Sequence, residues 1–264
     1  MTQTHEPPGL DFEFTSLGET CRGRCSLVSH DAPTVLMATG SGDMGAKGET
    51  WTKLPRRLRR HGISSIVFDF AGQGHSDGDR RALTLSKGVR NLEDALRHIL
   101  GWDWVRPEAL ALLGSSYGGN VVLAHLASED RAPVLGASLK SPCIDLRESH
   151  QLALGTDGMA AWERDGYSSE AGQNWSVIED ADASRLDERL HRITVPLLIT
   201  HGTADESVPI TQARRVRDRA GGVVDLVEMK GVNHHYSDRD DWDRMAAVHV
   251  GWLQQLFAGA ATRA

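Results

Sequence analysis

The chain of 264 residues is poor in three things: cysteine, long apolar runs and basic charge. Its three cysteines, Cys21, Cys25 and Cys143, are an odd number and lack CxxC spacing, so we expect reduced, buried thiols. No apolar stretch reaches the roughly 18 residues that span a bilayer. The 36 Asp and Glu residues outnumber the 29 Lys and Arg residues, which leaves a formal charge of -7. The sequence therefore predicts neither a membrane partner nor a nucleic-acid partner.

A secretory signal is also missing from the opening residues, because "MTQTHEPPGLDFEF" has neither a basic start nor an apolar run. We therefore expect a cytoplasmic location. Hydrophobic residues make up 40% of the chain and charged residues 25%, a balance that is typical of a soluble globular protein. Single α/β domains of this length are common, so length alone does not divide the chain.

Apolar runs predict the strands of a sheet. Residues 11–15 and 22–28 alternate loosely between apolar and polar side chains and predict half-exposed antiparallel strands. Six later runs are nearly continuous, which is typical of strands that helices cover on both faces. These six runs are residues 34–40, 64–70, 109–115, 135–141, 195–202 and 223–229.

Segments with helical spacing separate these runs, and they are residues 51–61, 85–100, 117–127, 211–220 and 242–257. The alternation predicts an α/β fold, with a mostly parallel sheet wound with helices on both faces. The rhythm breaks once, after the sixth strand, where residues 143–193 form an insertion. An insertion at the carboxyl end of a strand is placed to cover a site there, so we call it the cap. It divides the core into residues 1–142 and 194–264.

The segment "LALLGSSYGGN" places Gly-x-Ser-x-Gly directly between a buried strand and a helix. A nucleophilic serine on such a sharp turn needs small residues two positions before and after it, so that strand and helix can pack closely. Ser116 has Gly114 and Gly118 at these positions, whereas Ser115 would need a glycine where Leu113 stands. We therefore predict that Ser116 is a nucleophile.

A serine hydroxyl needs a base to take its proton and a third group to orient that base. Downstream, "LLITHGTADESVP" places Asp205 in the turn after a strand, with Glu206 beside it as a rival. "VVDLVEMKGVNHHYSD" places two adjacent histidines, His234 and His235, after the next strand. Both turns lie at the sheet edge where Ser116 also sits, because parallel strands end at the same edge.

Together these segments resemble the α/β-hydrolase superfamily of serine hydrolases, from about residue 34 to the C-terminus. "GSSYGG" resembles its nucleophile elbow, "HGTADESVP" its acid loop and "GVNHHY" its histidine loop, and "FDFAGQGHSDG" is similar to its glycine-rich segment after the fourth strand. The cap is similar to the small caps of cinnamoyl and feruloyl esterase-like carboxylesterases of bacteria. The resemblance implies a triad of Ser116, Asp205 and His234, and a shifted turn would exchange His234 for His235.

The resemblance also implies an oxyanion hole built from the backbone N–H groups of Ser41 and Tyr117. Thr39 stands where the family usually has histidine, but the donors are main-chain groups, so the hole can survive this departure. Asp43 follows closely, and we expect its carboxylate to face solvent or to bind a substrate amine. In the cap, Trp162, Tyr167 and Trp175 are candidates for an aromatic substrate wall, with ordinary packing as the alternative.

The sequence thus predicts a serine hydrolase that cleaves a carboxylic ester of a small-molecule acyl substrate through an acyl-enzyme, with no cofactor. A thioesterase, an amidase or peptidase, or an acyltransferase would use the same triad, and a non-catalytic ligand-binding protein is a further alternative. A metal enzyme built on His234, His235 and the acidic stretch "SDRDDWD" is disfavoured, because adjacent side chains on an extended loop point apart and no HExxH spacing occurs. We therefore predict no metal site, and the oligomeric state stays open.

Overall fold

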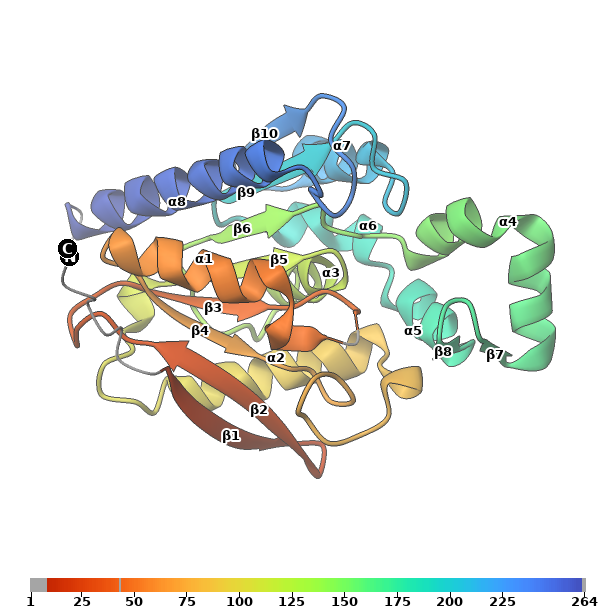
Figure 1. Ribbon diagram of the computed structural model, residues 1–264, viewed down its shortest axis with the longest axis horizontal. Coiled ribbons are helices and arrows are strands. Elements are labelled where there is room, and N and C mark those ends of the chain that lie inside the picture. The colour runs from red at the N-terminus through yellow and green to blue at the C-terminus, as the bar shows by residue number, and fades with distance from the viewer. Residues whose placement is uncertain (1–8, 43, 263–264) are drawn as a thin grey trace.

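The computed structural model describes residues 9–42 and 44–262, and an eight-stranded sheet forms its centre (Figure 1). In spatial order the strands are β1 (Leu10–Ser16), β2 (Glu19–Ser26), β4 (Ser64–Phe68), β3 (Thr34–Ala38), β5 (Leu110–Ser115), β6 (Ala137–Lys140), β9 (Leu197–Gly202) and β10 (Val224–Met229). The first two are antiparallel to their neighbours, and the pairs from β4 to β10 are parallel. The predicted sheet is confirmed.

The nearly continuous apolar runs correspond to strands that are buried along their whole length, namely β3, β4, β5, β6 and β9. Strand β10 lies at the sheet edge and is only partly buried, which explains the polar Asp225 and Glu228 within it. Two runs extend beyond their strands because Thr39 and Phe70 are buried in the loops that follow. An apolar run therefore indicates which residues are buried, and burial continues beyond the last residue that pairs with a neighbouring strand.

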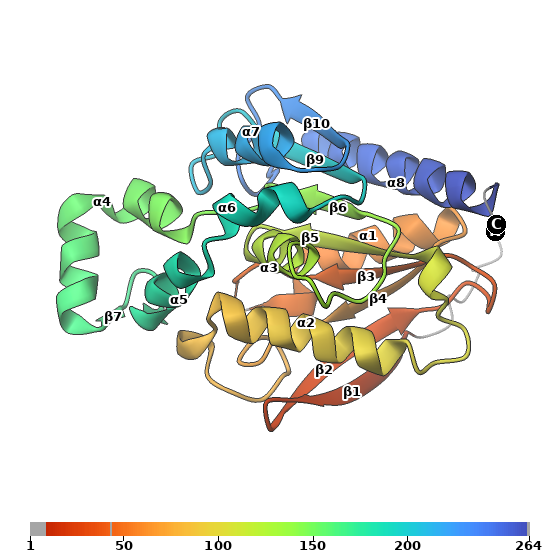
Figure 2. The ribbon, with the colours of Figure 1, turned by 180° about the vertical axis from the view of Figure 1, so that it is seen from behind.

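Helices cover both faces of the sheet, as predicted. Helices α1 (Glu49–Arg60) and α8 (Arg239–Ala261) lie on one face, and α2 (Leu85–Ile99), α3 (Tyr117–Leu126) and α7 (Ile210–Arg219) lie on the other (Figures 1 and 2). Each face has its own apolar cluster, with Leu54 and Leu253 in one and Leu92 and Val121 in the other. No helix in the described part of the chain is long and apolar enough to cross a membrane.

Side-chain caps begin several of these helices. The side-chain oxygens of Thr84 and Asp238 accept hydrogen bonds from the first backbone N–H groups of α2 and α8. Asp145 does the same for α4 (Leu146–Asp165). Such caps satisfy N–H groups that have no partner within the helix, and each contributes about 1 kcal/mol.

Residues 143–193 are mainly helical and extend away from the sheet (Figure 1). After α4 come the short hairpin β7 (Tyr167–Ser168) and β8 (Gln173–Asn174), then α5 (Ser176–Ser184), α6 (Leu186–Arg189) and the 3-10 turn η4 (Leu190–Arg192). Gly155 breaks α4 because its φ of 67° lies in the left-handed region. All three cysteines are free and buried, as expected.

Candidate active site

Ser116 sits at the turn between β5 and α3 and precedes the first residue of that helix. Its backbone has φ 52° and ψ -117°, a conformation that costs a non-glycine residue free energy and that clusters at functional sites. The side chain is half-buried, whereas Ser115 is buried as the last residue of β5. Of the two serines, Ser116 alone therefore stands on the strained strand-to-helix turn.

The two flanking glycines are required by close backbone packing. A Cβ atom on Gly118 would collide with the carbonyl oxygens of Ala38 and Thr39. A Cβ atom on Gly114 would lie 2.6 Å from the carbonyl oxygen of Gly118, a distance that real Cβ atoms essentially never show. We name residues 114–118 the nucleophile elbow, because its glycines bring β3, β5 and α3 together around Ser116.

The loop after β3 runs beside the nucleophile elbow. A Cβ atom on Gly40 would lie only 3.7 Å from Cβ of Ser116, and Ser41 follows as a half-buried residue. Thr39 stands where the resemblance to α/β hydrolases leads one to expect histidine. Its hydroxyl donates a hydrogen bond of 3.2 Å to Oε1 of Gln73. The Gln73 amide in turn donates to the Gly40 carbonyl at 2.9 Å, so this loop is anchored without the histidine.

Tyr117 begins α3, and the first N–H groups of a helix have no partner within it. The backbone N–H groups of Ser41 and Tyr117 belong to two segments that adjoin Ser116, and their role as an oxyanion hole stays a prediction. Asp43, the acidic residue of the same loop, lies outside the described residues.

The side chain of Asp69 anchors the loop after β3, a role that the sequence alone did not indicate. Its buried carboxylate accepts hydrogen bonds from the backbone N–H groups of Ala46 at 2.5 Å and His75 at 3.0 Å. Ideal Cβ atoms on Gly45 and Gly74 would both collide with this carboxylate. The two glycine-rich loops after β3 and β4 are thus held together by one side chain.

Strand register brings the other two triad candidates to the same edge. Ser115 pairs with Lys140, Lys140 pairs with Thr200, and Gly202 pairs with Met229, so β5, β6, β9 and β10 end side by side. Asp205 follows β9 in residues 203–209, the acid loop. His234 follows β10 in residues 230–238, the histidine loop.

Asp205 and His234 are in direct contact. Nδ1 of His234 lies 2.7 Å from Oδ2 of Asp205, and both side chains are nearly or fully buried. Oδ1 of Asp205 accepts from the backbone N–H groups of Ser207 at 3.0 Å and Val208 at 2.8 Å. Nε2 of the buried His201 lies 3.2 Å from Oδ2 of Asp205. The carboxylate is therefore fixed from several sides before it meets His234.

These contacts shift the pKa values of both groups. Burial alone would raise the pKa of Asp205, but the hydrogen bonds from His201 and His234 outweigh it and hold that pKa well below its usual range. Burial lowers the pKa of His234 below its ordinary value, although the bond to Asp205 opposes this shift. At neutral pH the pair is thus an ionised carboxylate beside a neutral imidazole, which leaves Nε2 of His234 free to accept a proton.

The two rivals, His235 and Glu206, have different surroundings. His235 is exposed and lines a surface groove of about 830 Å³ between α1 and the start of α8. Oε2 of the exposed Glu206 accepts a long hydrogen bond of 3.4 Å from the backbone N–H of His234. Neither rival takes part in the contact between His234 and Asp205.

A buried lysine, Lys140, contacts the histidine loop, and the sequence analysis did not predict this contact. Lys140 ends β6 with 7% of its surface exposed, and its Nζ donates to the carbonyl oxygen of His234 at 2.9 Å. The available signal was a charged residue within the otherwise apolar and small run "LGASLKS". Such a residue is unusual because burying a charge is costly.

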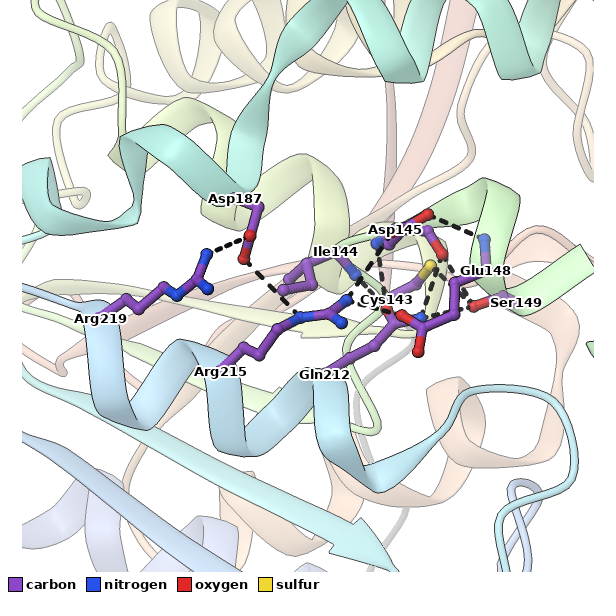
Figure 3. A network of polar contacts seen from close by, with 9 residues as sticks. All are labelled: Cys143, Ile144, Asp145, Glu148, Ser149, Asp187, Gln212, Arg215 and Arg219. Atoms are coloured by element: carbon purple, nitrogen blue, oxygen red, sulfur yellow. Dashed lines mark hydrogen bonds and ion pairs between the residues drawn. The ribbon is translucent and has the colours of Figure 1, made fainter.

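The root of the cap is tied to α7, the helix that follows the acid loop (Figure 3). The buried Gln212 accepts from the backbone N–H groups of Ile144 at 2.8 Å and Asp145 at 3.0 Å through Oε1. Its amide donates to the Asp145 carbonyl and to Oγ of Ser149, both at 3.1 Å. Arg215 adds an ion pair to Glu148 at 2.6 Å. The start of the cap is therefore bound to α7, which directly follows the acid loop in the chain.

Two of the three cap aromatics are packed inside the cap. Trp162 has 1% of its surface exposed and Trp175 has 7%, and their rings meet edge to face with centroids 5.5 Å apart. They share an apolar cluster with Met159, Ile178 and other cap residues. Tyr167, by contrast, is 43% exposed. The tryptophan pair thus forms the interior of the cap, and substrate contact by any of the three stays a prediction.

No group of three or more His, Cys, Asp or Glu side chains that could hold a metal ion occurs within residues 9–42 and 44–262.

The sheet order, the helices on both faces and the strained serine turn define the α/β-hydrolase fold. The family model that matches residues 81–260 is that of the prolyl oligopeptidase family, and the chain belongs to this family. Among solved structures, a complex of Est1E from Butyrivibrio proteoclasticus with ferulic acid is similar, with a TM-score of 0.82 and 19% identity. That match covers 94% of this chain and 99% of the other, and at this identity it shows the fold alone.

Two curated relatives have sequence similarity over part of the chain. A polyketide transferase from Penicillium sp is 32% identical over 140 residues, which are 52% of this chain and 46% of the transferase. A mitochondrial palmitoyl-protein thioesterase from Bos taurus is 25% identical over 190 residues, which are 68% of this chain and 60% of the thioesterase. The chain spans about half the length of the first curated relatives that it matches.

Proposed function

We propose that this protein is a serine hydrolase that cleaves a carboxylic ester through an acyl-enzyme intermediate. Ser116 is the nucleophile, His234 the general base and Asp205 the group that orients it. The observation that carries the proposal is the 2.7 Å contact between His234 and Asp205, in loops at the sheet edge where Ser116 directly precedes α3. The hydrolase fold and the thioesterase relative support the same class of reaction.

In the first half of the proposed reaction, Nε2 of His234 takes the hydroxyl proton of Ser116 as Oγ attacks the ester carbonyl. Asp205 remains ionised and stabilises the imidazolium that forms. The carbonyl oxygen becomes an oxyanion, which accepts hydrogen bonds from the backbone N–H groups of Ser41 and Tyr117. The ester C–O bond then breaks, the leaving alcohol takes the proton from His234, and the acyl group stays on Ser116.

In the second half, a water molecule attacks the carbonyl carbon of the acyl-enzyme while Nε2 of His234 takes a proton from that water. The tetrahedral intermediate breaks down to the carboxylic acid, and the proton on His234 returns to Oγ of Ser116. Water and another acyl acceptor would use the same geometry. The thioesterase and transferase relatives therefore support testing thioester cleavage and acyl transfer as second candidates.

The cap, residues 143–193, would cover this site, with residues 1–142 and 194–264 as the two parts of the hydrolase core. Support comes from the hydrogen bonds of Gln212, which hold the start of the cap against α7, the helix that follows the acid loop. A small-molecule acyl substrate would then bind between cap and core. The cytoplasmic location expected from the sequence stays a prediction.

The deciding experiment uses a fluorophosphonate probe, which forms a covalent bond with an activated serine and ignores a merely exposed one. We expect mass spectrometry of the labelled protein to find the probe on Ser116. A panel of nitrophenyl esters, feruloyl esters, acyl thioesters and peptides then identifies the bond that is cleaved. An unlabelled protein that hydrolyses none of these would favour a non-catalytic binding function.

A further inference from the structure

Lys140 connects the nucleophile elbow with the histidine loop. Its backbone carbonyl accepts a hydrogen bond of 3.0 Å from the N–H of Ser116, and its Nζ donates to the carbonyl of His234 at 2.9 Å. The same Nζ lies 4.7 Å from the ring centroid of Tyr236, over its face. One residue therefore touches the backbone of both the proposed nucleophile and the proposed base.

The histidine loop needs such an anchor because its backbone is strained. Tyr236 has φ 55° in the left-handed region, which a bulky residue rarely adopts. A conformation of this kind persists only when the surrounding contacts enforce it. The cation–π contact of Lys140 with the Tyr236 ring and the hydrogen bond to the His234 carbonyl are two such contacts.

The charged and titratable groups that face the Lys140 ammonium come from three segments. Asp205 in the acid loop attracts it, whereas His234 and Tyr236 in the histidine loop and His249 in α8 surround it. Burial lowers the pKa of Lys140 from 10.5 to about 8, and the charge of Asp205 only partly opposes this shift. The positive charge of Lys140 in turn lowers the pKa of His234.

The direction of this shift means that the charged lysine does not serve stability. The folded-state pKa lies below the unfolded value, so the unfolded chain binds more protons between pH 8 and 10.5, and stability rises with pH across that window. Below pH 8 the folded protein carries the whole cost of burying the ammonium. A charge that is retained at such a cost, beside two proposed catalytic residues, points to a role in the site.

We propose that Lys140, as an ammonium ion, is a positioning residue that holds the histidine loop against the nucleophile elbow, and that its deprotonation limits activity at alkaline pH. This inference rests on the proposed function of Ser116 and His234. The rate should then follow a bell-shaped pH profile, with loss of the His234 base on the acid side and loss of the Lys140 charge on the alkaline side.

The test compares Lys140→Met with the wild-type protein across pH 5 to 10. Methionine keeps an unbranched side chain of similar size and removes the charge and the donor. Exposed Lys230, in the same loop as His234, provides the matched control Lys230→Met. Two rates are measured for each protein, the rate of fluorophosphonate labelling and kcat/KM for a nitrophenyl ester, together with the melting temperature.

We expect Lys140→Met to react roughly 10- to 100-fold more slowly at pH 7, because a base displaced by about 1 Å loses this much. Its alkaline limb should disappear, and its acid limb should move to higher pH, because the charge that lowers the pKa of His234 is gone. Its melting temperature should not fall in step with the rate. Lys230→Met should keep both limbs and its rate.

If Lys140→Met has the rate and the pH–rate profile of the wild type, the inference about Lys140 is overturned. The triad would still be supported in that case, provided that the wild-type protein is labelled at Ser116. An unlabelled wild-type protein would overturn the triad and this inference together. If Lys140→Met does not fold, the pH–rate profiles of Lys140→Gln and of the wild type test the role of Lys140 instead. An alkaline limb in Lys140→Gln, or wild-type activity that stays level up to pH 10, rejects the role of Lys140.

Discussion

Nδ1 of His234 lies 2.7 Å from Oδ2 of Asp205, although the two residues are 29 positions apart in the chain. The contact forms because β9 and β10 are parallel neighbours whose carboxyl ends coincide. Hydrogen bonds from the acid loop and from His201 fix the carboxylate, so the imidazole ring has one favoured orientation. The predictions for the site depend on this relationship.

Asp205→Asn should reduce turnover by about 10⁴-fold, because the amide presents a donor where the His234 N–H needs an acceptor. Steady-state kinetics on the best ester of the panel measures this loss. Glu206→Gln is the matched control and should keep nearly full activity, since the Glu206 carboxylate accepts from the backbone N–H of His234 and not from its imidazole. Loss of activity in Glu206→Gln with an active Asp205→Asn would transfer the acid role to Glu206.

His234→Ala should remove nearly all activity, whereas His235→Ala should keep most of it. His234 has a lowered pKa, so the midpoint of the fall in the wild-type rate should lie below pH 6.5, the ordinary pKa of histidine, as the imidazole takes up a proton. His235→Ala should keep this acid limb. The reverse result in the two variants would falsify the assignment, and full activity in both would reject the triad.

Ser116→Ala should abolish fluorophosphonate labelling and lower turnover on the order of 10⁴ to 10⁶, with the fold intact. Ser115→Ala is the control, because this neighbouring hydroxyl belongs to a buried strand residue. Labelling and circular dichroism of both variants separate loss of chemistry from loss of structure. A dead Ser115 variant beside an active Ser116 variant would mean that the nucleophile elbow is misplaced.

Trp162→Ala should lower the free energy of unfolding by about 3 to 5 kcal/mol, because it removes a buried indole from the interior of the cap. Tyr167→Ala should change it by less than about 0.5 kcal/mol, since Tyr167 is exposed. Chemical denaturation measures both values. A Trp162 variant of normal stability with altered preference among acyl chains would instead support an aromatic substrate wall.

Stability should fall as the pH drops below about 6.5, because two buried histidines stay neutral in the folded protein. Burial lowers the pKa of His125 to about 4 and that of His249 to about 3. The unfolded chain therefore binds more protons in this window, and each histidine lowers stability by about 1.4 kcal/mol per pH unit until its folded pKa is reached.

His125→Leu isolates one of these two contributions. Neither ring nitrogen of His125 has a hydrogen-bond partner among the described residues, so leucine should be tolerated at pH 7. Unfolding measured between pH 6.5 and 4 should then show a shallower decline than in the wild type. An unchanged slope would mean that His125 does not contribute to the acid sensitivity.

Local features of the sequence determined the strand and helix pattern and the position of the nucleophile elbow. Alternating apolar runs and helical spacing record which faces are buried, so they predict the sheet and its covering helices. The glycines at 114 and 118 are steric requirements of a tight turn, so five residues are enough to predict Ser116 rather than Ser115 as the nucleophile. The order of strands also set Asp205 and the histidine pair at one edge.

Only the tertiary structure decided which side chains meet at that edge. The rings of His234 and His235 lie edge to face with centroids 5.4 Å apart, yet His234 is buried against Asp205 whereas His235 is exposed and lines a surface groove. The burial of Lys140 depends on the histidine loop, which lies far from it in the chain, and the burial of Trp162 depends on Trp175 and other residues that follow it in the cap. Sequence patterns carry information about burial along one element, whereas distances between side chains of different elements arise only when those elements pack.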